Sequence, residues 1–349
     1  MKDSVLKAVD FFCSGGGMTS GFVDAGIQVV AGIDNDPRCQ ATYEANNPGS
    51  TFLLADVCEL DECCFEKEFG LRKNDDNLVF IGCSPCQFWS IIQTDKKKSS
   101  KSKNLLHEFR RFVEYFQPGY VLVENVPGIL RRKEESGLQT FIDELKKRGY
   151  VVHYDIVNLA DYGVPQSRKR FSMVATRVLD RPPFPTKSSK QKTVRETIGK
   201  LPAISAGTKD ETKFAHTAAG LSEKNLQRLQ KTKSDGGSWL DWRDEPGLKR
   251  EKYTGSEFKD NYGRMYWDKP APTITTKFFT VSNGRFAHPE QDRAISIREG
   301  ALLQTFPADY EFKTTSMASS ARIIGNAVPP YFAKKLAEAI IEGRKNAGK

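Results

Sequence analysis

The sequence has no apolar run near the roughly 18 residues that a membrane-spanning helix requires, so it does not predict an integral membrane protein. Its first residues, MKDSVLKAVDFF, mix acids with lysines and lack a small-residue cleavage site, so they do not predict a secretory signal. Internal repeats are absent as well. We therefore expect a cytoplasmic protein without a membrane partner.

Histidine is scarce, with four residues in 349, and the seven cysteines are an odd number confined to the first quarter of the chain. Such a set disfavours a secreted disulfide framework and suits reduced thiols in the cytosol. Cys83 and Cys86 form a C-x-x-C, which leaves a redox pair or half of a zinc site as alternatives. No second C-x-x-C exists and the histidines show no ligand spacing, so we expect no metal.

Positive charge exceeds negative charge, with 53 Lys and Arg against 44 Asp and Glu and a net charge of +9. Cationic side chains gain affinity for phosphates because binding releases counterions, so a polyanionic partner is compatible with this balance. An ordinary basic enzyme is equally compatible. Charge alone does not decide between the two.

The first half of the chain alternates short apolar runs with helix-like segments, which favours an α/β fold with a doubly wound, mostly parallel sheet. The predicted strands are residues 5–12, 28–34, 77–83, 120–126, 151–158 and 170–176, and the predicted helices are residues 105–116, 138–148 and 331–344.

The composition of the sequence changes after Arg177. Residues 181–190 are typical of a boundary loop, and the sequence that follows them is polar and weakly periodic. We expect one domain at 1–180, completed by 318–349, and a second, smaller domain of short strands and loops at 181–317. The low-complexity segment Asp95–Lys103 predicts a solvated loop.

Three strand ends carry residues suited to chemistry. The first strand runs into Cys13–Gly17, a glycine-rich turn before a helix, and the second ends at Asp34, which suits an adenosine-type cofactor although a purely structural turn is the alternative. Cys86 follows a later strand and is either a nucleophile or a buried apolar thiol. Glu124 ends the next strand and is either paired structurally or active in proton transfer, and adjacent strand ends favour the second.

The order of five sequence blocks resembles the DNA (cytosine-5) methyltransferases, of the bacterial or phage restriction-modification type. The blocks are Asp10–Phe12 with its turn, Pro85–Gln87, Glu124–Val126, Gln166–Arg170 and Arg322–Val328, the last preceded by SIREGALLQTFP at 296–307. The resemblance spans nearly the whole chain apart from about residues 181–290. It implies a Rossmann-like fold that binds S-adenosylmethionine, with a target-recognition domain, and methylation of carbon 5 of a flipped cytosine in a specific duplex sequence.

The resemblance implies a role for each catalytic residue. Cys86 would add to carbon 6 of the cytosine as a thiolate, so that carbon 5 becomes nucleophilic. Glu124 would share a proton with ring nitrogen 3. Arg170, and secondarily Arg168, would hold the carbonyl oxygen of the base.

The resemblance also implies a cofactor site in which Asp34 binds the ribose hydroxyls and Asp56 binds the adenine amino group. Three positions depart from the family pattern, since Ser14 replaces a common glycine, Asn35 replaces a frequent tryptophan and Trp89 replaces a frequent phenylalanine. The implied cofactor-binding residues are Phe12, Ser14, Gly15, Gly17, Asp34, Asn35, Asp56, Val57, Pro85, Asn326 and Val328.

Duplex DNA is the expected partner, because the target cytosine must leave the helix before it can react. The Asp95–Lys103 loop either closes over DNA phosphates or is a passive charged loop. Seven residues of the variable region suit groove contacts, although its tryptophans are also typical of a small core: Trp239, Trp242, Arg243, Lys249, Arg250, Arg264 and Lys277.

Three other functions share parts of the pattern. A tRNA cytosine methyltransferase would keep the catalytic blocks, but about a hundred residues between the Arg170 and Ser296 blocks favour a groove-reading domain. A nicotinamide-dependent oxidoreductase would need neither Cys86 nor Glu124. An inactive DNA-binding regulator is disfavoured because Cys86, Glu124 and Arg170 occur together. A cognate restriction endonuclease is a possible partner, and we expect a monomer.

Overall fold

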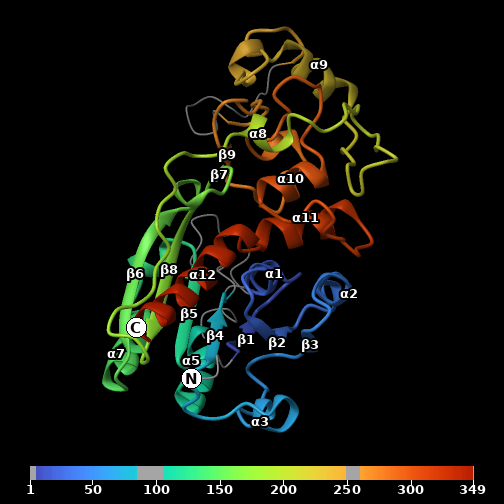
Figure 1. Ribbon diagram of the computed structural model, residues 1–349. Helices are drawn as coiled ribbons and strands as arrows, with labels where there is room; N and C mark the ends of the chain where they lie inside the picture. Colours follow the sequence, from blue (N-terminus) through green and yellow to red (C-terminus); the bar gives the residue numbers. More distant parts are fainter. Residues whose placement is uncertain (1–4, 85–104, 249–259, 349) are drawn as a thin grey trace. The chain divides into compact units, whose positions relative to one another are not determined.

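The computed structural model describes residues 5–84, 105–248 and 260–348, which form two compact units (Figure 1). The sheet unit comprises Met1–Tyr162, Lys169–Lys187 and Val328–Lys349, and the second unit comprises Gly163–Arg168 and Ser188–Ala327. The second unit thus extends to Ala327, whereas the sequence prediction assigned 318–349 to the first domain. Across the described ranges, no helix combines the length and apolarity needed to span a membrane.

The sheet unit is built on a seven-stranded mixed sheet with the order β3-β2-β1-β4-β5-β8-β6. Strands β3, β2, β1, β4 and β5 are parallel, and β8 is antiparallel to both β5 and β6. The strands are β1 (Lys7–Phe11), β2 (Gln28–Asp34), β3 (Thr51–Leu54), β4 (Leu78–Gly82), β5 (Tyr120–Asn125), β6 (Val151–Asn158) and β8 (Lys169–Thr176). All six predicted strands are confirmed, and only the four-residue β3 was not predicted.

Helices cover both faces of this sheet. They are α1 (Gly17–Asp24), α2 (Pro37–Asn46), α3 (Cys64–Phe69), α5 (Leu105–Phe116), α6 (Gly128–Arg131), α7 (Leu138–Lys147) and α12 (Pro330–Ala347), with a 3-10 turn η1 (Leu159–Tyr162). The predicted helices correspond to α5, α7 and α12. Each has apolar residues at helical spacing, and this pattern buries one face of the helix.

The alternation of side chains along β1 assigns the two faces. Phe11 packs against Phe109 of α5 and Phe65 of α3, with ring centroids 5.1 and 5.6 Å apart, in a large aromatic core. Asp10, one residue earlier, points to the opposite face, where it accepts hydrogen bonds from Thr19 of α1. The glycine-rich turn Cys13–Gly17 therefore follows a strand that is packed on both faces.

A close helix contact lies on the Asp10 face of the sheet. A Cβ atom added at Gly21 of α1 would lie 2.2 Å from the carbonyl oxygen of Pro330, at the start of α12. Glycine at this position is therefore required for packing between the two helices rather than for a turn. The contact fixes α1, whose N-terminus follows the glycine-rich turn.

The second unit consists mostly of loops and short helices, so the predicted loops are present, whereas strands are few among its described residues. Its regular elements are β7 (Gln166–Ser167), α8 (Val194–Ile198), α9 (Glu223–Lys231), η2 (Trp239–Trp242), β9 (Ala271–Pro272), η4 (Val281–Asn283), α10 (Ile297–Leu303) and α11 (Met317–Asn326). Apart from the β7–β9 pair, the described residues contribute only isolated bridges. Helix α11 packs against α10, which explains why residues 318–327 belong to this unit.

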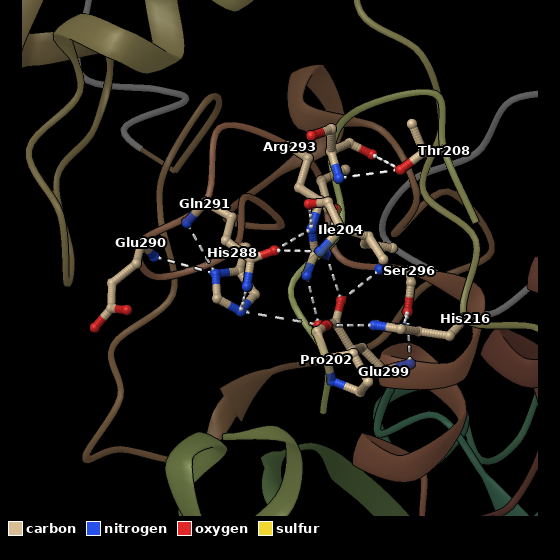
Figure 2. Close-up of polar contacts among 12 residues, drawn as sticks. Pro202, Ile204, Thr208, His216, His288, Glu290, Gln291, Arg293, Ser296 and Glu299 are labelled. Carbon is tan, nitrogen blue, oxygen red and sulfur yellow. Dashed lines mark hydrogen bonds and ion pairs between the residues drawn. The ribbon is translucent and has the colours of Figure 1, made fainter. Parts of the chain in front are cut away.

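Buried arginines in this unit donate hydrogen bonds to the backbone carbonyl oxygens of its loops, which have no sheet to pair with. Arg264 donates to the carbonyl oxygens of Thr232, Leu229 and His288, at 2.8 to 3.1 Å. Arg293 pairs with the buried Glu299 at 2.6 Å (Figure 2). Because a buried backbone carbonyl without a donor is unfavourable, these guanidinium groups allow irregular backbone to be buried.

Candidate functional site

The carboxyl ends of β1, β2, β4 and β5 meet along one edge of the sheet, where open α/β sheets bind their ligands. Because β8 is antiparallel, its first residues lie at the same edge. This arrangement brings together most of the described residues that the sequence assigned to a site: Phe12, Ser14, Gly15, Gly17, Asp34, Glu124 and Arg170.

The glycine-rich turn has an unusual backbone. Phe12 and Ser14 have φ angles of 64° and 48°, and Gly16 has 86°, so three of five successive residues are left-handed. The amide of Ser14 donates to Asp34 Oδ2 at 2.9 Å, while the amide of Asp36 donates to Asp34 Oδ1 at 2.9 Å. The predicted acid at the end of β2 therefore holds the turn.

Two predicted cofactor-binding residues, Asp56 and Val57, follow β3. Asp56 is partly exposed and its Oδ1 accepts the amide of Cys58 at 3.0 Å, while Val57 is buried. Asn35, at the position where relatives often carry tryptophan, is exposed at the end of β2. A partly exposed carboxylate suits a purine with an amino group, which it can accept as a hydrogen-bond donor.

Asp10 is a buried acid at this edge to which the sequence reasoning assigned no role. Its Oδ2 accepts the amide and the hydroxyl of Thr19 at 3.1 and 2.7 Å, and its Oδ1 is buried without a partner. Burial raises the pKa of Asp10 to about 7, although the Thr19 hydrogen bonds oppose this. The position of this acid within an apolar strand was the sequence feature that could have indicated a buried carboxyl group.

An ion pair joins Glu124, at the end of β5, to Arg170 of β8. Arg170 Nε lies 3.1 Å from Glu124 Oε1, and both side chains are largely buried. The neighbouring Asn125 donates to the carbonyl oxygen and the hydroxyl of Ser84, both at 3.2 Å, and so fixes the backbone just after β4. Pro85 and Cys86, which follow Ser84 directly, lie outside the described residues.

Cys83 is a described thiol at this edge, directly after β4. Burial raises its pKa well above the usual value, and the charge of Glu124 acts in the same direction. A thiol of this kind is not a nucleophile at neutral pH, because the thiolate is the reactive form. Cys83 therefore matches the apolar alternative for a free cysteine.

Arg168 differs from Arg170 in its contacts. Its guanidinium is buried in the second unit and donates to the carbonyl oxygens of Ile274, Gly325 and Ala327, at 3.0 to 3.2 Å. These contacts organise the unit around β9 and the end of α11, so they favour a positioning role over the contact with the base that the sequence reasoning expected. Asn326 is exposed at the end of α11, and Val328 is buried.

The residues that suit groove contacts in the sequence differ in their exposure. Arg264 is 2% exposed, so its burial contradicts groove contact, while Trp242 lies in the hydrophobic core of the second unit, as the core alternative for the tryptophans predicts. Arg243 and Lys277 are exposed. Lys249 and Arg250, like the Asp95–Lys103 loop, lie outside the described residues.

No group of three or more His, Cys, Asp or Glu side chains that could hold a metal ion occurs within 5–84, 105–248 and 260–348. The described polar groups of the sheet edge include the carboxylates of Asp34 and Glu124 and the guanidinium of Arg170, which are suited to a polar organic ligand.

Sequence comparison connects this geometry to known proteins. The family model for the C-5 cytosine-specific DNA methylases matches residues 6–342. The chain is 39% identical to the Type II methylase M.HgiDII of Herpetosiphon aurantiacus over 96% of this chain and 95% of that protein. It is 30% identical to the Type II methyltransferase M.DdeI of Desulfomicrobium norvegicum over 96% of this chain and 88% of that protein.

Solved structures share the fold at lower identity. A structure described as a DNA modification methyltransferase encoded within an E. coli prophage aligns with a TM-score of 0.75 and 23% identity, over 97% of this chain and 99% of that chain. The Dnmt2 methyltransferase of S. pombe aligns with a TM-score of 0.63 and 16% identity, over 99% and 100%. At these identities the likeness concerns the fold alone.

Proposed function

Because the chain belongs to the C-5 cytosine-specific DNA methylase family, and so methylates carbon 5 of cytosine in DNA, we propose which of its residues carry the reaction and which methyl donor it uses. The observation that carries the proposal is the Glu124–Arg170 pair, which lies at the same sheet edge as the Ser14–Asp34 contact. One edge thus combines a group for proton transfer, a cation and a turn suited to a cofactor.

The methyl donor in this proposal is S-adenosylmethionine, which supplies a methyl group on a positively charged sulfur. The residues fit it, because Asp34 can accept ribose hydroxyls and Asp56 can accept an adenine amino group, with Val57 beside it. The left-handed turn allows a ligand to approach the backbone closely in front of α1. The remaining predicted contacts are proposed with them: Phe12, Gly15, Gly17, Asn35, Pro85, Asn326 and Val328.

The thiolate of Cys86 adds to carbon 6 of an extruded cytosine, and the electron pair gained by the ring makes carbon 5 nucleophilic. Glu124, in its protonated form, shares its proton with ring nitrogen 3 as negative charge develops there. Arg170 donates to the carbonyl oxygen of the base while its ion pair orients Glu124. After carbon 5 takes the methyl group, it loses its proton and the electron pair of that bond expels Cys86.

Arg168 acts in this proposal as a positioning residue. Its three carbonyl contacts fix the chain two residues before Arg170, so Arg168→Lys lowers the rate by disturbing Arg170 rather than by losing a contact with the base.

Recognition of duplex DNA is proposed for the second unit, which approximates the target-recognition domain predicted at 181–317, with the catalytic domain at 1–180 and 318–349. Its exposed cations Arg243 and Lys277 are available for phosphates, whereas its buried arginines are not. A monomeric cytoplasmic enzyme, with a restriction endonuclease that acts on the same site, completes the proposal.

A mechanism-based trap tests the nucleophile. Duplex oligonucleotides with 5-fluorocytosine at the target should form a covalent adduct at Cys86 in the presence of S-adenosylmethionine, because fluorine cannot leave as a cation. Cys86→Ser should abolish the adduct and keep DNA binding, whereas Cys83→Ser, the matched control, should keep both. An adduct that survives Cys86→Ser would refute the assignment, and adduct formation on tRNA in place of duplex DNA would refute the substrate.

A further inference from the structure

The loop that follows β3 carries the two residues proposed for the adenine end of the methyl donor, Asp56 and Val57. The loop, residues 55–63, belongs to no strand or helix of the sheet unit. Its internal hydrogen bonds include those from the amides of Cys58 and Glu59 to Asp56 and from the amide of Cys63 to Asp61, and none of these reaches the carbonyl group of Val57 or Leu60. The carbonyl groups of Val57 and Leu60 therefore need donors from elsewhere in the fold.

Arg111 of α5 supplies these donors. Its Nη2 atom donates to the carbonyl oxygens of both Val57 and Leu60, each at 2.7 Å. Its Nη1 pairs with Glu62 at 2.6 Å and its Nε pairs with Glu108 at 2.9 Å. Four of the five guanidinium N–H groups thus have acceptors, and two carboxylates balance the charge.

The loop 55–63 is held both by apolar packing and by the hydrogen bonds from Arg111. Val57 is 3% exposed and belongs to the aromatic core that also contains Phe65 of α3. The Arg111 contacts hold the backbone on both sides of residues 58 and 59, directly after Asp56. A displacement of this backbone would move Asp56 and Val57 together, because both lie at the beginning of the clamped turn.

We propose that Arg111 is a positioning residue for the methyl donor: it fixes the loop that presents Asp56 and Val57 to the adenine ring. This inference rests on the proposed use of those two residues for S-adenosylmethionine. Arg111 does not contact the donor itself; it acts through two backbone carbonyls. Lysine cannot replace it, since a single ammonium group does not reach two carbonyls and two carboxylates in a planar array.

The test compares Arg111→Lys with Arg110→Lys. Arg110 is the neighbouring residue on α5, and its ion pair is with Glu114 on the same helix, at 3.2 Å. Calorimetry should measure the binding of S-adenosylmethionine and S-adenosylhomocysteine to the DNA-free protein, and steady-state kinetics should measure KM and kcat. We expect Arg111→Lys to weaken binding and raise KM by about tenfold with kcat within about twofold, while Arg110→Lys changes neither.

Unchanged binding of both ligands to folded Arg111→Lys would overturn the inference, as would a fall in kcat with unchanged KM, which is the result of a merely structural role. Hydrogen exchange at the amides of Cys58 and Glu59 gives a readout independent of activity, and it should become faster in Arg111→Lys. If that variant does not fold, Glu62→Gln, which removes one carboxylate of the clamp, should weaken binding two- to threefold, and no change would refute the clamp.

The substitution Asp56→Ala separates this inference from the proposed function. If Asp56→Ala leaves binding of both ligands unchanged while Arg111→Lys weakens it, the adenine contact is misassigned but positioning by Arg111 stands. If Asp56→Ala weakens binding and Arg111→Lys does not, the cofactor site stands and the inference about Arg111 fails.

Discussion

We expect His288 to make the second unit less stable in acid. Its Nδ1 atom accepts the backbone amides of Glu290 and Gln291 at 3.2 and 3.0 Å (Figure 2). A ring nitrogen that accepts two N–H groups carries no proton, so the neutral ring has its proton on Nε2. Protonation at Nδ1 would break both hydrogen bonds within a buried site.

The pKa of His288 gives the size of the effect. Burial lowers this pKa from 6.5 to about 4; the Glu299 carboxylate opposes the change, and the charges of Arg293 and Arg264 add to it, with a further contribution from His216. Between pH 6.5 and about 4 the unfolded chain binds a proton at this residue and the folded protein does not. Stability therefore decreases as pH falls through this window, by about 3 kcal/mol at about 1.4 kcal/mol for each pKa unit.

The assay is urea unfolding followed by tryptophan fluorescence at several pH values. Three of the four tryptophans, Trp239, Trp242 and Trp267, lie in the second unit, and the Trp267 ring contacts His288 with centroids 5.2 Å apart. The variant His288→Asn keeps an acceptor near Nδ1 but cannot take up a proton. Between pH 7 and pH 4.5 the parent protein should lose about 2 to 3 kcal/mol more stability than the variant.

A matched control separates this residue from general acid unfolding. His153→Asn changes an exposed histidine of β6, in the sheet unit, and should keep the pH dependence of the parent protein. If His288→Asn lost as much stability as the parent between pH 7 and pH 4.5, then His288 would not be the group that titrates, and the reasoning from its two accepted hydrogen bonds would be refuted.

Two further substitutions test the sheet unit. Gly21→Ala places a Cβ atom against the Pro330 carbonyl oxygen and should lower the free energy of unfolding by about 1 to 3 kcal/mol, measured by thermal unfolding. Gly49→Ala, with open space around the added Cβ atom, should not lower it. Equal melting temperatures for the two variants would contradict the close contact. Asp10→Asn keeps an acceptor for Thr19 and removes a buried acid with a pKa of about 7, which in the folded parent retains its proton above the usual 3.8. From pH 5 to pH 8 the parent should therefore lose about 3 kcal/mol of stability in urea unfolding followed by circular dichroism, and the variant should not; a parallel loss in both would exclude Asp10.

The local pattern of the sequence determined most of the sheet unit. Apolar runs bounded by turn residues predicted six of its strands, and helical spacing of apolar residues predicted α5, α7 and α12. These elements are predictable because each depends on neighbouring residues, with a period of two or of 3.6. The same logic placed Asp34 and Glu124 at strand ends, and the order of the sequence blocks indicated the family that the comparisons show.

The second unit was less predictable because its structure depends on contacts between distant residues. Its polar sequence suggested short strands and cationic groove contacts, yet Arg264 is buried among loop carbonyls, some of which lie more than thirty positions away in the chain. A sequence does not distinguish an exposed arginine from one that satisfies buried backbone groups. Only the folded chain assigns Arg264 to the interior and leaves Lys277 on the surface.

Tertiary structure also decided which residues support the site. Nothing in the spacing of Arg111 relates it to Val57, 54 positions earlier, or distinguishes it from Arg110. Likewise, Arg168 and Arg170 are two positions apart, but one donates to three carbonyls and the other pairs with Glu124. The sequence by itself determined the types of chemical group at the strand ends, because residue type and strand register are local; their partners became known only from the three-dimensional packing, because those contacts join distant parts of the chain.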